Sequence, residues 1–132
     1  MTEKQYAVMV VEDEELLLNA IAKKLDLNGY KVVSCKSGGQ AIDYLKNMDQ
    51  KPDAIWLDYY LKDMNGLAFM DELKKLSGGV HIPIMVVSNS ASDEKVHSML
   101  ALGAKKYMLK AQYRLDDLIH ALRDIITESI AA

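Results

Sequence analysis

Four short apolar segments of the chain each end at a polar residue that could take part in phosphoryl transfer. The first segment ends at Glu12-Asp13, the second at Asp58, and the other two at Ser88 and Lys110. Carboxylates can bind a divalent cation or act as a nucleophile, and a hydroxyl and an amine can hold phosphoryl oxygens. These residue types therefore predict a phosphoryl-transfer centre, provided that the fold brings them together.

The segments around these residues alternate between apolar runs of strand length and stretches with helical spacing. This alternation is typical of a parallel β-sheet covered by helices on both faces. We expect strands near residues 6–11, 31–35, 54–58, 82–88 and 105–110, with a helix after each. Because the carboxyl ends of parallel strands lie along one edge of an open sheet, the polar residues would converge there.

The apolar spacing also predicts which helix faces are buried and where helices end. The first helix is expected to bury Leu17, Ala20, Ile21 and Leu25, and the fourth to bury Val96, Met99 and Leu100. The clearest stripe belongs to the last helix, at Leu115, Leu118, Ile119, Leu122, Ile125 and Ile126. Helix ends are expected at Gly29, Gly103 and the segment Ser77-Gly78-Gly79.

Length and composition suit one domain: the chain has 132 residues, of which 50% are hydrophobic. We expect a single domain over residues 1–132, with its core at about residues 5–128.

The net charge is −3 and the basic residues are scattered, which argues against nucleic-acid binding through this domain. The N-terminus has no apolar stretch long enough for a signal peptide or a membrane span, so we expect a cytoplasmic protein without a membrane partner. Cys35, the single cysteine, excludes an internal disulfide and is interpreted as a small buried hydrophobe.

Glu12, Asp13 and Asp58 would form a carboxylate cluster if the first and third strands are neighbours. Like charges at short distance raise the pKa of at least one carboxyl unless a positive charge intervenes. Mg²⁺ would relieve the repulsion, because it typically binds one or two carboxylates, several waters and a phosphate oxygen. Acid clusters are also often only solvated, and we interpret Glu14 and Glu15 in that way, as charges at the positive end of the first helix. For Glu12 and Asp13, which stand directly at the strand end, we favour a metal site.

Asp58 is the candidate nucleophile, because it ends the most interior strand, where a charge is unexpected without a function. The alternative role, a cap for the next helix, suits Asn65 better, since Gly66 follows it. Lys110 could be a surface amine, and Ser88 alone would be an ordinary turn hydroxyl. Only the whole constellation favours a role for both in binding phosphoryl oxygens.

Together these residues resemble the receiver domain of two-component response regulators, and the resemblance covers nearly the whole chain. It rests on Val11-Glu12-Asp13-Glu14, on Leu57-Asp58 followed by Met64-Asn65-Gly66, on Val87-Ser88, and on Leu102-Gly103-Ala104 leading to Tyr107 and Lys110. The resemblance implies an α/β fold of the flavodoxin-like, doubly wound kind. In that fold a five-stranded parallel sheet with the order 2-1-3-4-5 is covered by five helices.

By the same resemblance, Asp58 accepts a phosphoryl group from a sensor histidine kinase or a histidine phosphotransfer protein. The resemblance also implies an Mg²⁺ ion bound directly by Asp13, Asp58 and the backbone carbonyl of Tyr60. Glu12 would act on this ion through water. The chain would promote its own phosphorylation and dephosphorylation without being a turnover enzyme.

The resemblance further implies that Lys110 pairs with a phosphoryl oxygen and that Ser88 donates a hydrogen bond to another. Movement of Ser88 would open space for Tyr107 to rotate, so the two residues would form a switch. The switch would alter a face built from helix 4, strand 5 and helix 5, which would bind a downstream protein or form a reversible homodimer. On this face we expect these residues to be exposed: Lys95, His97, Lys105, Lys106 and Arg114.

Three positions depart from the family pattern. Lys62 and Ala111 stand where proline is usual, and Asn89 stands where a small residue is usual. The Lys-Pro bond of the family is commonly cis, whereas a cis bond before alanine costs about 2.5–4 kcal/mol. We therefore predict a trans bond between Lys110 and Ala111, with Lys110 placed by a shifted loop.

Other classes of protein fit the sequence less well. A receiver-like interaction module that works without phosphorylation, which we keep as the alternative, would not need the complete set of polar residues described above. A hydrolase with an aspartate nucleophile would need a second acid where Tyr60 stands. A flavodoxin would need a phosphate-binding loop rich in Ser, Thr and Gly after the first strand, and the residues there are mainly acidic.

Overall fold

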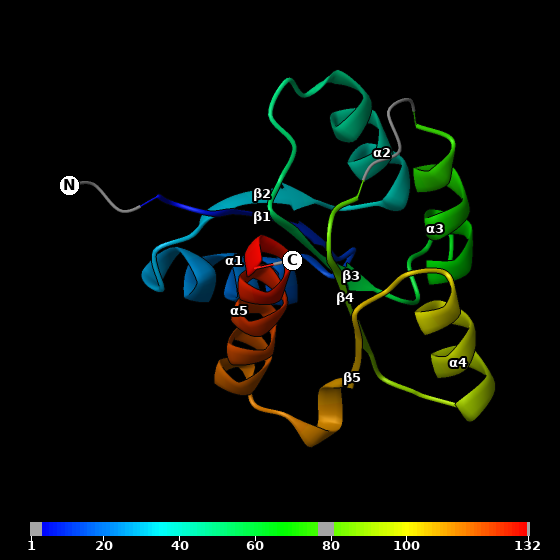
Figure 1. Cartoon of the computed structure of the whole chain (residues 1–132). Helices are drawn as coiled ribbons and strands as arrows, with labels where there is room; N and C mark the ends of the chain where they lie inside the picture. Colours follow the sequence, from blue (N-terminus) through cyan, green and yellow to red (C-terminus); the bar gives the residue numbers. More distant parts are fainter. Residues whose placement is uncertain (1–3, 77–80, 132) are drawn as a thin grey trace.

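Strands and helices alternate along the chain in the computed structural model, which describes residues 4–76 and 81–131 (Figure 1). The strands are β1 (Ala7–Val11), β2 (Lys31–Cys35), β3 (Ala54–Asp58), β4 (Ile84–Ser88) and β5 (Lys106–Leu109). The helices are α1 (Glu15–Leu27), α2 (Gly38–Asn47), α3 (Gly66–Lys74), α4 (Asp93–Ala101) and α5 (Leu115–Ala131), and a 3-10 turn covers Lys110–Gln112. All five predicted strands are present.

The strands form one parallel sheet with the order β2-β1-β3-β4-β5, as the resemblance implied. Val11, the last residue of β1, lies opposite Cys35 of β2 and Leu57 of β3. On the other side of β3, Asp58 lies opposite Val87 of β4. The carboxyl ends of β1, β3 and β4 therefore reach the same edge of the sheet, which we call the carboxyl edge.

Helices cover both faces of the sheet, with α1 and α5 on one side and α2, α3 and α4 on the other (Figure 1). Because side chains alternate along a strand, Met9 and Ile55 pack against α2 and α3, whereas Val10 and Trp56 pack against α1 and α5. All five residues of β3 and all five of β4 are buried. Burial of both faces is expected for the inner strands of a parallel sheet, so a charge at the end of β3 lies close to the core.

Two predicted helix faces are wrong at one position each. Ala20 is exposed, and α1 instead buries Leu18 together with Ile21 and Leu25. Position 20 lies about 200° around the helix from position 18, so it faces solvent once Leu18 faces the sheet. In α4, Leu100 is also exposed, because the fully buried Met99 sets the inner face and the next residue is turned by about 100°.

The ends of the elements mostly follow the predictions. Gly29 and Gly103 follow α1 and α4 with φ angles of 90° and 112°, which residues with a side chain rarely adopt. The helix end predicted at Ser77-Gly78-Gly79 lies outside the described residues. Asn65 caps α3 as predicted, since its Oδ1 accepts the Ala68 N–H at 2.9 Å.

None of the helices in the described part of the chain combines the length and apolar character that a membrane crossing requires.

Candidate functional site

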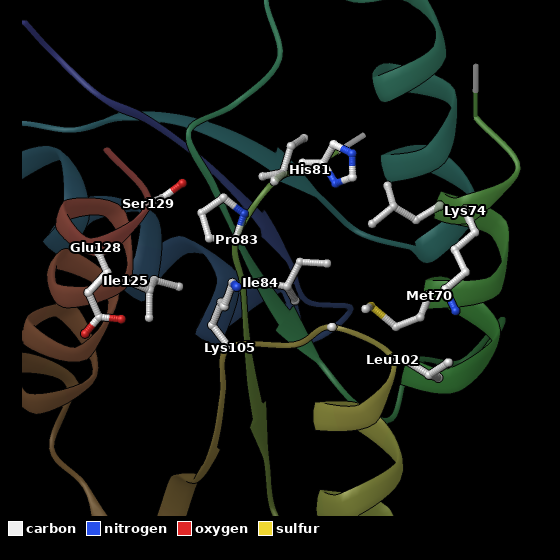
Figure 2. A pocket seen from close by; sticks show the side chains of 13 residues that line it. Met70, Lys74, His81, Pro83, Ile84, Leu102, Lys105, Ile125, Glu128 and Ser129 are labelled. Atoms are coloured by element: carbon white, nitrogen blue, oxygen red, sulfur yellow. The ribbon is translucent and has the colours of Figure 1, made fainter. Parts of the chain in front are cut away.

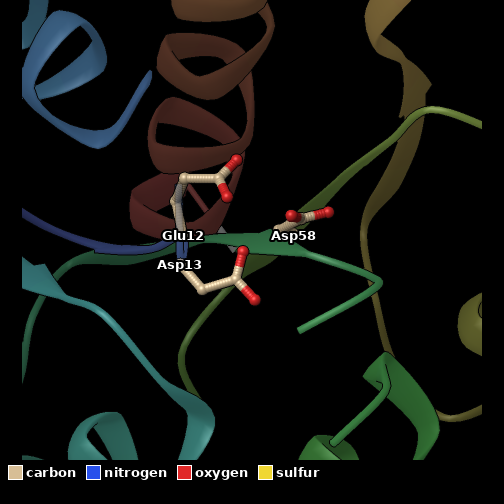
Figure 3. Close-up of side chains that lie close together, drawn as sticks. All are labelled: Glu12, Asp13 and Asp58. Atoms are coloured by element: carbon tan, nitrogen blue, oxygen red, sulfur yellow. The ribbon is translucent and has the colours of Figure 1, made fainter. Parts of the chain in front are cut away.

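Glu12, Asp13 and Asp58 meet at the carboxyl edge, as the sequence predicted. Figure 3 shows the three carboxylates gathered where β1 and β3 end. Each residue offers one oxygen atom, and these oxygens lie within 4.8 Å of one another. The meeting follows from the strand order, because Val11 of β1 pairs with Leu57 of β3 and the acids are the residues that come next in each segment.

Lys110 joins this cluster from the turn directly after β5, a strand that lies two positions away from β3 in the sheet. Its Nζ lies 3.0 Å from Glu12 Oε1 and 3.5 Å from Asp58 Oδ2. Glu12 is 2% exposed and Asp58 is 7% exposed, so the two ion pairs are largely shielded from solvent. Lys110 begins the 3-10 turn that follows β5 and does not extend the strand as predicted, because the strand ends at Leu109.

The burial of these charges changes their protonation. Burial, together with the nearby charge of Glu12 and against the opposing charge of Lys110, raises the pKa of Asp58 to about 7. Burial alone would lower the pKa of Lys110, but its hydrogen bond to Glu12 and the charge of Asp58 raise it above its usual value. Lys110 therefore stays a cation, whereas the ionised form of Asp58 is only partly compensated.

Backbone N–H groups complete the surroundings of the two aspartates. The Lys62 N–H donates to Asp13 Oδ2 at 2.7 Å, and the Tyr60 N–H donates to Asp58 Oδ1 at 3.3 Å. Both donors belong to the loop of residues 59–65 between β3 and α3. A proline at position 62, as the family usually has, could not donate this hydrogen bond because it has no N–H.

Ser88 and Tyr107 also reach this edge. Ser88 is completely buried at the end of β4, and its Oγ accepts the Ser90 N–H at 3.3 Å. Tyr107 in β5 is half-buried, and its hydroxyl donates to the Ser90 carbonyl at 2.9 Å. The two candidate switch residues are therefore connected through Ser90.

The environment of the expected output face is partly different from the prediction. His97, Lys105 and Arg114 are exposed, but Lys95 and Lys106 are half-buried. Lys95 Nζ lies 4.6 Å from the ring centre of Tyr60 and 5.7 Å from that of Tyr59, within the range of cation–π contacts. No sequence pattern indicated these contacts, because they join the start of α4 to the loop after β3.

Two smaller predictions can be compared with the structure. The described residues contain no cis peptide bond, so the bond between Lys110 and Ala111 is trans as predicted. Cys35 is buried at the end of β2, and burial raises the pKa of its thiol to about 12. The interpretation of Cys35 as a buried hydrophobe is confirmed.

The carboxylate cluster suits a hard divalent cation. Its donors are oxygens, which Mg²⁺ prefers, and they lie close enough for one ion to meet more than one of them. A single ammonium, Lys110, faces the three acids among the contacts described, so the cluster keeps an excess of negative charge. A cation would offset that excess.

A separate cavity of about 570 Å³ lies at the opposite edge of the sheet (Figure 2). Residues of α3, β4 and α5 line it, including Met70, Ile84 and Ile125. Most of its lining is apolar, and Glu128 is its one carboxylate. The chemistry predicted from the sequence therefore belongs to the carboxyl edge and not to this cavity.

Comparison with known proteins agrees with this geometry. The family model described as "Response regulator receiver domain" matches residues 8–123. The chain belongs to the receiver domain family of response regulators. As a receiver domain it is a phosphoacceptor signalling module and not a turnover enzyme.

Among curated relatives, the transcriptional regulatory protein KdpE of Mycobacterium tuberculosis is 32% identical over 126 residues, covering 95% of this chain and 53% of KdpE. The two-component response regulator ORR8 of Oryza sativa subsp. indica is 30% identical over 103 residues, covering 78% of this chain and 84% of ORR8. This receiver domain spans about half the length of KdpE and several other relatives that it matches.

Solved structures share the fold. A CheY-like receiver domain protein from Methanospirillum hungatei has a TM-score of 0.84 at 22% identity, covering 95% of this chain and 96% of that one. The receiver domain of the sensor histidine kinase PA1611 from Pseudomonas aeruginosa has a TM-score of 0.80 at 24% identity, covering 94% and 99% of the two chains. The PA1611 structure has a magnesium ion coordinated in its active site cleft.

Proposed function

We propose that Asp58 accepts a phosphoryl group from a phosphohistidine on a sensor histidine kinase or a histidine phosphotransfer protein. The observation that carries this proposal is the position of Asp58, which is nearly buried at a strand end, beside two more carboxylates and within 3.5 Å of the Lys110 ammonium. Such a group is poorly placed for stability and well placed for chemistry.

The transfer breaks one bond and forms one. A carboxylate oxygen of Asp58 attacks phosphorus and forms the O–P bond of an acyl phosphate, while the P–N bond electrons return to the imidazole of the donor, whose other ring nitrogen carries a proton, so that it leaves as neutral histidine. Lys110 lies within reach of the new phosphoryl oxygens and would exchange part of its contact with Asp58 for them. Ser88 would donate its hydroxyl proton to another oxygen.

Asp13, Asp58 and the Tyr60 carbonyl would hold Mg²⁺ directly, and Glu12 would hold it through water. When bound, Mg²⁺ supplies positive charge to the phosphoryl oxygens. The close oxygens of Glu12, Asp13 and Asp58 support this assignment. The excess negative charge of the cluster supports it as well.

The test is intact-mass spectrometry after incubation with acetyl phosphate and MgCl₂. We expect one added phosphoryl group, lost in hydroxylamine, and no addition with EDTA or in Asp58→Asn. Asp53→Asn is the matched control, since Asp53 lies at the opposite edge of the sheet and should leave labelling unchanged. Equal labelling of Asp58→Asn would contradict the assignment and place the phosphoryl group on another residue, whereas no labelling of the wild type would favour a module that works without phosphorylation.

Phosphorylation is further proposed to alter the face of α4, β5 and α5 through Ser88 and Tyr107. The support is the connection between the two residues through Ser90. Hydrogen exchange with and without beryllofluoride should show changed protection at Ser88 and from α4 through α5. A change confined to the surroundings of Asp58 would contradict the switch and leave the phosphoacceptor assignment intact. The downstream protein or the reversible homodimer would bind this face.

A further inference from the structure

Asp63, a residue that no motif singled out, connects the loop after β3 to the start of α2. We propose that Asp63 is a positioning residue for the cation site, because it holds the loop of residues 59–65 where the Lys62 N–H meets Asp13. This inference rests on the proposed metal site and adds to it a residue that touches neither the cation nor the phosphoryl group.

The carboxylate of Asp63 accepts two backbone hydrogen bonds from the first turn of α2. Gly38 N–H donates to Oδ1 at 3.1 Å, and Gly39 N–H donates to Oδ2 at 2.9 Å. The first N–H groups of a helix have no partner within the helix, and a negative charge is favourable there. The first turn of α2 has no acidic residue, and its cap Ser37 accepts only the next N–H, that of Gln40. Asp63 therefore supplies from a distant loop what α2 lacks locally.

The loop also packs directly against the backbone of α2. A Cβ atom on Gly38 would lie 2.5 Å from Met64 Sδ, and one on Gly39 would lie 3.4 Å from Asp63 Oδ2. Glycines at these two positions let the loop approach closely. Asp63 and Met64 thus hold the loop at one place on α2.

Contacts within the loop link the position of Asp63 to that of Lys62. Leu61 is buried, and its N–H donates to the Met64 carbonyl at 3.1 Å. Tyr60 and Asn65 form an antiparallel bridge across the base of the loop. Lys62 lies at the tip of this closed turn, directly before Asp63, so holding Asp63 also fixes the direction of the Lys62 N–H.

Lys62 in turn orients Asp13. Its N–H donates to Asp13 Oδ2 at 2.7 Å, which is shorter than the backbone contacts of Tyr60 with Asp58 and of Glu14 with Glu12. An ionised carboxylate has about four lone-pair sites, so this bond leaves others for a cation. Partners that orient a ligand in this way commonly change metal affinity about 10- to 100-fold when removed.

The experiment is an Mg²⁺ titration of the whole chain followed by backbone amide NMR. We expect Asp63→Ala to bind Mg²⁺ about tenfold more weakly, at the low end of the range for such partners, and to speed hydrogen exchange at the Lys62 amide. Asp63→Asn keeps one oxygen acceptor, so its Mg²⁺ affinity should fall between that of the wild type and that of Asp63→Ala. Asp53→Ala is the matched control: it removes a carboxylate that accepts the Ala7 N–H at 2.8 Å at the opposite edge, and its Mg²⁺ affinity should equal that of the wild type.

The outcomes separate this inference from the proposed function. Wild-type protein without Mg²⁺ binding overturns the metal site and this inference with it. If the wild type binds Mg²⁺ and Asp63→Ala binds it equally well but has lower thermal stability, only the positioning role is overturned. Asp63 is then a structural cap of α2. Should Asp63→Ala not fold, Asp63→Asn decides: weaker binding supports the role, and unchanged binding overturns it.

Discussion

The two edges of the sheet use the same residue types in opposite ways. At the edge opposite the carboxyl edge, which we call the amino edge, Asp53 accepts the Ala7 N–H at 2.8 Å. Asp53 also pairs at 3.5 Å with Lys4, whose side chain is 69% exposed. At the carboxyl edge, Glu12 and Asp58 are buried around Lys110. The first arrangement connects β1 to the start of β3 at little electrostatic cost. The second keeps charge in the core, which stability does not require and the proposed phosphoryl transfer would use.

Removing the lysine at each edge should show the largest difference. Lys110→Ala leaves Glu12 and Asp58 without their cation, and we expect it to lower the free energy of unfolding at pH 8 by about 2–4 kcal/mol, near the range for broken buried pairs. Lys4→Ala removes an exposed partner, so we expect a loss below about 1 kcal/mol. Urea denaturation followed by circular dichroism measures both, and equal losses would show that the buried ion pairs of Lys110 contribute no more to stability than the exposed pair of Lys4.

The same acid-to-amide change should have opposite signs at the two edges. The pKa of Asp58 is raised to about 7 from an unfolded value of 3.8, mainly by burial, so between about pH 4 and pH 7 the folded state keeps a proton that the unfolded state loses. Stability contributed by Asp58 is thus present at low pH and lost as the pH rises through about 7.

Asp58→Asn should therefore raise the free energy of unfolding at pH 8 by on the order of 1–3 kcal/mol and flatten this pH dependence. Asp53→Asn weakens a structural contact and should lower the free energy of unfolding by about 1 kcal/mol. Urea denaturation from pH 4 to pH 8 without added Mg²⁺ measures the slopes. A destabilised Asp58→Asn at pH 8 would mean that Lys110 fully compensates the buried charge.

Glycine substitutions sharpen the comparison with a smaller effect. A Cβ on Gly66 would lie 2.8 Å from the buried ring of Tyr59, so we expect Gly66→Ala to cost about 1–2 kcal/mol through overpacking. Gly103, near the amino edge, has open space but a φ of 112°, and Gly103→Ala should cost a similar amount through backbone strain. Only Gly66→Ala should change the near-ultraviolet circular dichroism of the tyrosines, and a change in both would contradict the separate causes.

The sequence predicted the helices and strands well, because apolar runs and helical spacing reflect which residues of each element are buried. Its errors came where the choice of inner face depended on neighbours. Ala20 and Leu18 are both apolar, and only packing against the sheet selects Leu18. Lys95 is charged and was expected in solvent, but the tyrosines that approach it come from another strand end.

The sequence by itself determined which groups this receiver domain places at its strand ends: three acids, a hydroxyl and an amine. Strand order also followed from those residues, through the family that they resemble. Only the tertiary structure decided how the groups share charge, since Lys110 lies 3.0 Å from Glu12 and 3.5 Å from Asp58. It alone joined Asp63 to α2, 24 and 25 positions away. Periodicity records which face a residue occupies, whereas pairing and pKa depend on distances that only the packed chain sets.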